Sequence, residues 1–158
     1  MNMERIMIKC VCFLALLSLF FGQSTYANTT DALNLAGTYH CSGYDARDGG
    51  YQNATVTLTL NAEQSDFTAN YGAYGFTLTL EDGARYVGEA AASGNSLAIY
   101  FENTASTTIG RSDHGIGIAV VTHDKNIEGK ATTIFHKFYY EPKYKGGNNG
   151  TETCVKNK

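Results

Sequence analysis

The chain is built largely from short runs in which apolar and polar side chains alternate. In residues 54–60, one valine and two leucines occupy one set of alternate positions and threonines occupy the other, and residues 76–80 repeat the arrangement. Alternation with a period of two is typical of a β-strand with one buried face, because successive side chains point to opposite sides of a sheet. The sequence therefore predicts an all-β domain.

Turn-forming residues divide these runs into eight predicted strands. We expect the strands at residues 37–43, 54–61, 66–71, 74–81, 85–92, 96–102, 115–124 and 130–141. Short links favour antiparallel pairing of sequential strands, and eight such strands close most simply into an up-and-down β-barrel without exposed edges. Two longer connections, 44–53 and 103–114, leave a sandwich with Greek-key crossings as the alternative.

Residues 1–27 have the features of a secretory signal peptide. They combine a basic start (Arg5 and Lys9), an apolar run at 11–21 and small residues up to Ala27. The apolar run is shorter than the roughly 20 residues that a membrane-spanning helix needs. We therefore expect cleavage after Ala27, a secreted or periplasmic protein without a stable membrane anchor, and a single domain over residues 28–158.

Two cysteines, Cys41 and Cys154, remain after this cleavage. In an exported protein an even pair is typical of a disulfide, and this one would join the N-terminal strand to the C-terminal tail. Metal binding by two thiolates is the alternative, but the nearby cysteine or histidine partners of such sites are missing from the sequence. We expect neither a metal nor a cofactor.

The charge along the chain argues against nucleic-acid binding. Residues 31–128 hold twelve acidic side chains against four basic ones, whereas residues 129–158 hold six lysines against two glutamates. These lysines are spread along a strand and a tail, and the sequence pI is about 5.7. Nucleic-acid-binding domains are usually basic and cluster their arginines and lysines on one face.

The opening Leu35-Ala36-Gly37-Thr38-Tyr39 resembles the first strand of the calycin-like barrels, the lipocalin and avidin group, in which Gly-x-aromatic follows a short lead-in. The order of the later strands also resembles small exported bacterial barrels of unassigned function. The resemblance implies a calycin-like fold with a ligand-binding interior. Tyr39 replaces the family's tryptophan, and the chain has no tryptophan at all, which argues against the biotin pocket of avidins.

A second resemblance is to small periplasmic lysozyme inhibitors. It is carried by Tyr39-His40-Cys41, by Gly83-Ala84-Arg85-Tyr86 and by the C-terminal cysteine. It implies a loop that enters the lysozyme cleft, although Asp82 stands where those proteins carry a serine. The resemblance therefore gives inhibition of lysozyme in the periplasm as an alternative function.

Three histidines are the residues most suited to chemistry. His136 shares strand parity with Thr132, Ile134 and Phe138, so we expect it to face the interior as a ligand contact or as a core histidine with satisfied nitrogens. His123 lies near a strand end and His114 at the end of a loop. The residue types of a catalytic Ser-His-Asp triad occur together at Ser112-Asp113-His114, but adjacency in sequence does not create the geometry of a triad.

Tyrosines are the second group of candidates, because they offer flat apolar area with a hydroxyl group. The expected ligand-binding residues are His136, Tyr44, Tyr51, Tyr74 and His114. Tyrosine is also an ordinary strand residue, so packing is the competing interpretation. Residues 138–150 pass from aromatic and lysine side chains to a Gly-Asn run, which is either a surface for an acidic partner or a linker that lets the tail reach the disulfide.

These features predict a non-enzymatic barrel that binds a small apolar ligand, or a host protein or glycan, at its mouth and loops, and that can act as a secreted effector. Homo-oligomerisation and a small histidine-dependent enzyme are further alternatives. Whether the interior holds a pocket depends on volume. Bulky side chains on the strands at 54–61, 74–81 and 96–102 should fill it, whereas Gly115, Gly117 and Ala119 thin one wall.

Overall fold

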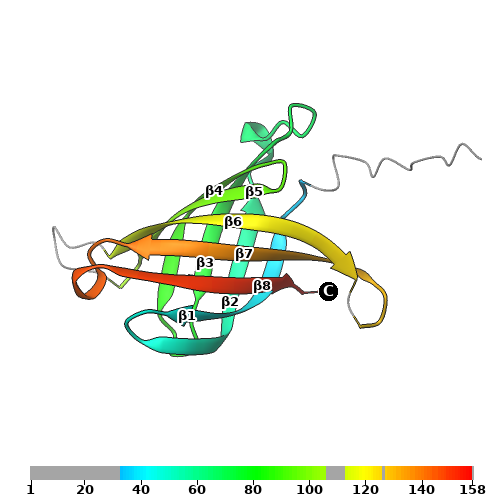
Figure 1. The fold of residues 1–158 in the computed structure, drawn as a ribbon. Coiled ribbons are helices and arrows are strands. Elements are labelled where there is room, and N and C mark those ends of the chain that lie inside the picture. Colours follow the sequence, from blue (N-terminus) through cyan, green and yellow to red (C-terminus); the bar gives the residue numbers. More distant parts are fainter. Residues whose placement is uncertain (1–32, 106–112, 126, 158) are drawn as a thin grey trace, which may run out of the picture.

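The fold was analysed in a computed structural model that describes residues 33–105, 113–125 and 127–157 (Figure 1). The predicted signal peptide, residues 1–27, lies outside the described residues. The strands are β1 (Gly37–Asp45), β2 (Gly49–Leu60), β3 (Tyr71–Thr79), β4 (Arg85–Ser93), β5 (Ser96–Asn103), β6 (His114–Lys125), β7 (Ala131–Glu141) and β8 (Asn148–Lys156), with 3-10 turns η1 (Ala62–Gln64) and η2 (Tyr144–Gly146).

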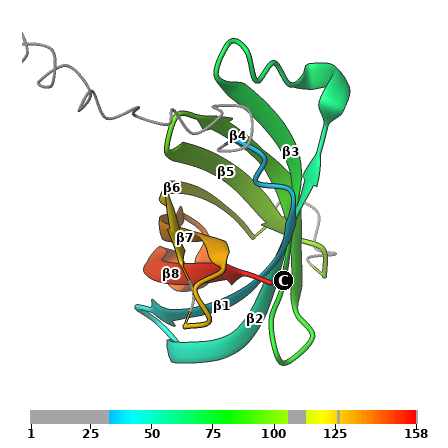
Figure 2. The same ribbon diagram turned by 90° about the vertical axis from the view of Figure 1, so that its right-hand side faces the viewer.

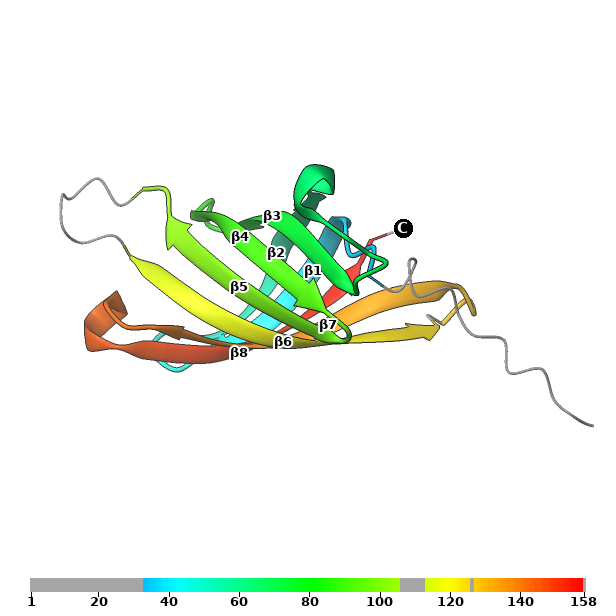
Figure 3. The ribbon, with the colours of Figure 1, turned by 90° about the horizontal axis from the view of Figure 1, so that it is seen from above.

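Each strand pairs antiparallel with the next, and β1 pairs with β8 to close the barrel. The predicted eight-stranded antiparallel up-and-down barrel is therefore confirmed, and the alternative sandwich is wrong. Figure 1 shows β6, β7 and β8 side by side across the front of the barrel, and Figure 2 shows how β1 and β2 close its lower edge. Seen from above, β3, β4 and β5 lie over β1 and β2 (Figure 3).

One predicted strand is wrong and one observed strand was missed. The segment 66–71 is a turn, because the Asp66 carboxylate accepts hydrogen bonds from the backbone N–H groups of Thr68 and Ala69 (3.0 and 3.1 Å) and stops the chain from extending. The Gly-Asn run is not a linker, since Asn148 begins β8. Its composition conceals a strand with a regular alternation of buried and exposed positions.

The predicted disulfide is present and closes the barrel seam. Cys41 of β1 and Cys154 of β8 are directly opposite each other, with Cα atoms 4.1 Å apart. This spacing is close to that of a non-hydrogen-bonded antiparallel pair, in which side chains approach most nearly. The bond therefore joins two strands that the barrel already places side by side.

The end of the barrel where β1 begins is filled. Leu33 and Leu35, in the segment before β1, are 1% and 2% exposed. The Tyr39 hydroxyl donates to the Leu35 carbonyl oxygen (2.6 Å), and the Tyr74 hydroxyl donates to that of Leu33. Apolar side chains such as Val56, Leu58, Phe76, Leu97, Ile99 and Phe135 pack above this plug.

Candidate functional site

The opposite end of the barrel contains a cavity of about 660 Å³. It lies where β1, β3, β5 and β7 end and where β2 and β4 begin, so several hairpins contribute to its wall. Five carboxylate side chains and one lysine line it together with aromatic rings. The charged lining residues are Asp45, Asp48, Glu81, Asp82, Glu141 and Lys137, and the aromatic ones are Tyr51, Tyr86, Phe101, Tyr139 and Tyr144.

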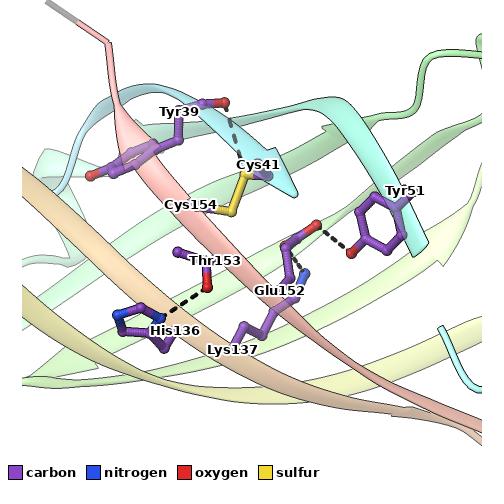
Figure 4. Close-up of a disulfide and its surroundings, with 8 residues drawn as sticks. All are labelled: Tyr39, Cys41, Tyr51, His136, Lys137, Glu152, Thr153 and Cys154. Atoms are coloured by element: carbon purple, nitrogen blue, oxygen red, sulfur yellow. Dashed lines mark hydrogen bonds and ion pairs between the residues drawn. A yellow bond between two sulfur atoms is a disulfide. The ribbon is translucent and has the colours of Figure 1, made fainter. Parts of the chain in front are cut away.

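A buried ion pair lies at the inner wall of this cavity, which its lysine, Lys137, lines. Lys137 Nζ of β7 lies 2.5 Å from Glu152 Oε2 of β8, and both side chains are at most 1% exposed. The contact lacks the geometry of a hydrogen bond, so the ammonium compensates the negative charge of the carboxylate without donating to Oε2. The other oxygen, Oε1, accepts a hydrogen bond from the Tyr51 hydroxyl (2.9 Å), as Figure 4 shows beside the disulfide.

Aromatic rings surround the same ammonium group. Lys137 Nζ lies 5.4 Å from the ring centre of Phe76, 5.6 Å from that of Phe101 and 5.3 Å from that of Tyr139. The faces of aromatic rings carry partial negative charge and attract a cation at such distances. The barrel therefore stabilises one internal cation by a carboxylate on one side and aromatic rings on the others.

A second polar network lies nearer the opening and holds two carboxylates without a cationic partner among the described residues. Asn148 Nδ2 donates to Asp45 Oδ2 (2.6 Å) and to Glu141 Oε2 (2.8 Å). Asp45 Oδ2 also accepts from the Tyr139 hydroxyl (3.1 Å). Because both carboxylates need donors, the amide of Asn148 must present its NH₂ to them, and its Oδ1 is left buried without a partner in the described part of the chain.

Glu141 is the most perturbed acid of this network. Its side chain is buried, and burial raises its pKa from the usual 4.5 to about 7. The nearby carboxylates of Asp113 and Asp45 add to the rise, whereas the hydrogen bond from Asn148 and the charge of Lys137 oppose it. A pKa in this range is typical of functional sites, although buried structural networks also produce it.

Glycines make room for these side chains. A Cβ atom at Gly115 would lie 2.4 Å from the Phe101 ring and 2.9 Å from Glu141 Cγ, and one at Gly117 would lie 3.2 Å from Lys137. A Cβ atom at Gly150 would lie 2.3 Å from the Tyr139 hydroxyl. Gly115 and Gly117 were expected to thin one wall, and the structure shows that neighbouring side chains occupy the space they leave.

The rim of the opening is tied together across the barrel seam. The Asp48 carboxylate pairs with the Lys145 ammonium and accepts a hydrogen bond from the Tyr144 hydroxyl (2.6 Å). Arg47 Nε donates to the Gly147 carbonyl oxygen (3.1 Å). These contacts hold the β1–β2 and β7–β8 turns against each other, and the pairing with Lys145 lowers the pKa of Asp48.

The structure distributes the predicted tyrosines over different places. Tyr51 lies in the cavity wall, where burial raises its pKa and its hydroxyl stays a donor to Glu152. Tyr44 is exposed at the same end of the barrel, on an outer hollow beside Tyr51. Tyr74 is buried at the plugged end, where it contacts Leu33. Their roles in ligand binding stay predictions.

The predicted histidines do not meet. His136 is exposed on the outer face, where its Nδ1 lies 3.0 Å from Thr153 Oγ1, so the expected inward orientation is wrong (Figure 4). His114 and His123 lie towards opposite ends of β6, with the His114 ring 6.3 Å from that of Tyr100 and His123 Nδ1 3.3 Å from Thr133 Oγ1. Ser112 lies outside the described residues.

The parity of β7 was misjudged because the outer face at β5–β8 is apolar and the interior is partly polar. Lys137 and Glu141 share the buried parity of Phe135 and Tyr139, whereas Phe138 is half exposed. Exposed apolar patches are typical of interaction surfaces, and the predicted homo-oligomer stays a prediction. The exposed apolar side chains of these strands are Tyr100, Ile116, Ile118, Val120, Phe138, Tyr140 and Val155.

One group of side chains in the described residues has the spacing of a metal site. Ligand atoms of Cys41, Glu152 and Cys154 lie within 4.8 Å of one another. Both sulfurs are joined in the disulfide, so neither is a thiolate that could ligate a metal.

Among the residues that the structure describes, no helix is long and apolar enough to cross a membrane.

Comparisons with known proteins add little to this geometry. No protein-family model matches the chain, and no curated protein sequence matches it. A solved structure described as EF1p2_mFAP2b bound to DFHBI is similar to it with a TM-score of 0.48 and 14% sequence identity, covering 82% of this chain and all of the other. The closed barrel itself fits the calycin-like fold that the sequence resemblance implied.

The sequence did not point to five charged or amide residues of the two polar networks, namely Asp45, Lys137, Glu141, Asn148 and Glu152. The available signal was the even spacing of Lys137 and Glu141 with Phe135 and Tyr139, which places charges on the same strand face as large aromatic side chains. Asn148 and Glu152 gave no such signal, because the strand that carries them was not recognised.

Proposed function

We propose that this protein is a non-enzymatic binding protein that holds a small molecule in the cavity at the open end of its barrel. The observation that carries the proposal is the contrast between the two ends. Leu33 and Leu35 plug one end, whereas the other end has a cavity of about 660 Å³. Ligand pockets for small molecules usually have volumes of about 300–1,000 Å³ and combine apolar walls with a few placed polar groups.

The cavity lining favours a ligand that is not purely apolar. An apolar ligand would cover the carboxylates of Asp45 and Glu141 without replacing the water they lose, and burying a charge without a partner is costly. The rings of Tyr86 and Phe101 offer apolar area beside these polar groups. We therefore narrow the expected small apolar ligand to an amphipathic one.

We further propose that the protein acts in the periplasm or outside the cell. The Cys41–Cys154 bond supports this, because stable disulfides form mainly in oxidising compartments. The segment 1–27 supports it through its signal-peptide features. Cleavage after Ala27 is tested by N-terminal sequencing of the protein recovered from the periplasm and from the medium.

Native mass spectrometry of protein purified from its natural compartment tests the binding function. We expect a retained small molecule that is lost in Ala84→Trp, since Ala84 lies in the cavity wall and the indole would fill the opening. Ala69→Trp is the matched control, because Ala69 is exposed near the plugged end. The proposal fails if the cavity variant takes up ligands, including the neutral apolar dye Nile red, as well as the unmodified protein does.

A further inference from the structure

The charge distribution inside the barrel limits the chemistry of the ligand. Lys137 is the only cationic side chain that lines the described wall of the cavity, and Glu152 already balances it at 2.5 Å. The carboxylates of Asp45 and Glu141 lie in the same cavity with amide and hydroxyl donors but without a cation. The described cavity therefore has an excess of negative charge that the protein does not neutralise.

Glu141 gives a specific attachment point. Its side chain is 5% exposed and lines the cavity. Oε2 accepts a hydrogen bond from Asn148, whereas Oε1 has no hydrogen-bond donor among the described residues. Oε1 is not among the fully buried atoms, so it can be reached from the cavity, where a charged donor on a ligand would form a strong hydrogen bond with it.

The aromatic walls fit the same kind of ligand. Tyr51, Tyr86 and Tyr139 line the cavity near these carboxylates, and burial keeps the tyrosine hydroxyls protonated by raising their pKa values. The barrel already uses this combination for its own Lys137, whose ammonium lies among three rings and one carboxylate. Rings and carboxylates together are a general means of binding organic cations.

We propose that the ligand is an amphipathic organic cation, an amine whose ammonium group binds Oε1 of Glu141, in the field of the neighbouring Asp45 carboxylate, while its apolar body lies against the aromatic wall. This inference rests on the proposed binding function. Anions are excluded from the site by repulsion from the carboxylates, and neutral molecules of the same shape bind more weakly because they leave Glu141 unbalanced.

Three probes with one indole body separate these cases: tryptamine, which is a cation, tryptophol, which is neutral, and indole-3-acetate, which is an anion. The chain has no tryptophan, so the protein contributes no indole fluorescence of its own to that of a bound probe. At pH 8 we expect tryptamine to bind at least about tenfold more tightly than tryptophol, a difference of about 1.4 kcal/mol, and indole-3-acetate to bind most weakly.

Glu141→Gln tests the attachment point because it keeps the shape and removes the charge. We expect tryptamine affinity to fall about tenfold and tryptophol affinity to change less than about twofold. Glu63→Gln is the matched control, since Glu63 is exposed in η1 outside the cavity. If Glu141→Gln does not fold, the preference of the unmodified protein for tryptamine over tryptophol is compared at pH 6 and pH 8. The pKa of Glu141 is about 7, so the lower pH removes the same charge and should reduce that preference.

The outcomes distinguish this inference from the proposed function. Equal or tighter binding of tryptophol or indole-3-acetate overturns the inference and leaves a binding barrel. The same holds if no probe binds while Nile red still enters the cavity, or if removing the charge of Glu141 does not reduce the preference for tryptamine over tryptophol. If neither the probes nor Nile red bind, both the inference and the binding function fail.

Discussion

Replacing Lys137 with methionine tests whether the interior depends on the balance between its buried charges. The substitution keeps the length of the side chain and leaves the Glu152 carboxylate buried with one hydrogen bond, from Tyr51. Breaking a buried ion pair from one side costs about 3–5 kcal/mol, because the remaining charge is uncompensated. Glu152→Gln should cost about 3 kcal/mol, the lower end of that range, since the rings around Lys137 still stabilise its ammonium.

The double variant is expected to be much more stable than the sum of the two changes. With Lys137→Met and Glu152→Gln together, no charge is stranded. The amide oxygen of the introduced glutamine would still accept from the Tyr51 hydroxyl, so a loss of about 0–2 kcal/mol is expected. Urea unfolding followed by far-UV circular dichroism measures all three values, and the cycle gives the coupling energy.

An exposed ion pair provides the control. Lys130→Met removes a partner that lies 3.8 Å from Glu128 at the surface, and we expect it to cost less than about 1 kcal/mol. The reasoning is refuted if the losses in the two buried single variants add up in the double variant, or if Lys137→Met costs no more than Lys130→Met.

Three further changes follow from the same structure. The pKa of Glu141 is raised from 4.5 to about 7 in the folded protein, so its contribution to stability is complete below pH 4.5 and is lost as the pH rises through 7. The free energy of unfolding should therefore fall by about 3 kcal/mol over this range. Urea unfolding from pH 4 to 8 should show a smaller fall in Glu141→Gln. Reducing the Cys41–Cys154 bond, which has a sequence separation of 113, should lower the free energy of unfolding by about 4–5 kcal/mol, measured by urea unfolding with and without dithiothreitol. His136→Ala should change stability by less than about 1 kcal/mol and leave ligand retention unchanged, because its hydrogen bond to Thr153 lies on the outer surface.

Each of these expectations has a clear contrary result. An identical pH slope in Glu141→Gln and the unmodified protein would show that Glu141 does not titrate differently in the two states. A reduced protein as stable as the oxidised one would mean that pairing of β1 with β8 alone sets stability. Loss of ligand in a folded His136→Ala protein would place the binding site on the outer face.

The strands themselves were largely predictable from the sequence. Alternation located seven of the eight strands, since a strand with one buried face imposes its period on local sequence whatever its neighbours are. The error at Asp66 arose because a side chain that caps a turn looks, in sequence, like the polar position of a strand. The strand at Asn148 was missed because asparagine and glycine there satisfy neighbouring carboxylates and leave room for Tyr139, and both needs arise only once the barrel is closed.

The cavity was decided by tertiary structure alone. Alternation by itself predicts that apolar positions face the interior. This holds for Val56 and Phe76 but fails for β7, where Phe138 faces outward and Lys137 faces inward. A charged lysine in the interior needs a compensating partner, and here β8 supplies it as the Glu152 carboxylate. Alternation determines which side chains share a face, and the closing of the barrel determines which of the two faces is inside.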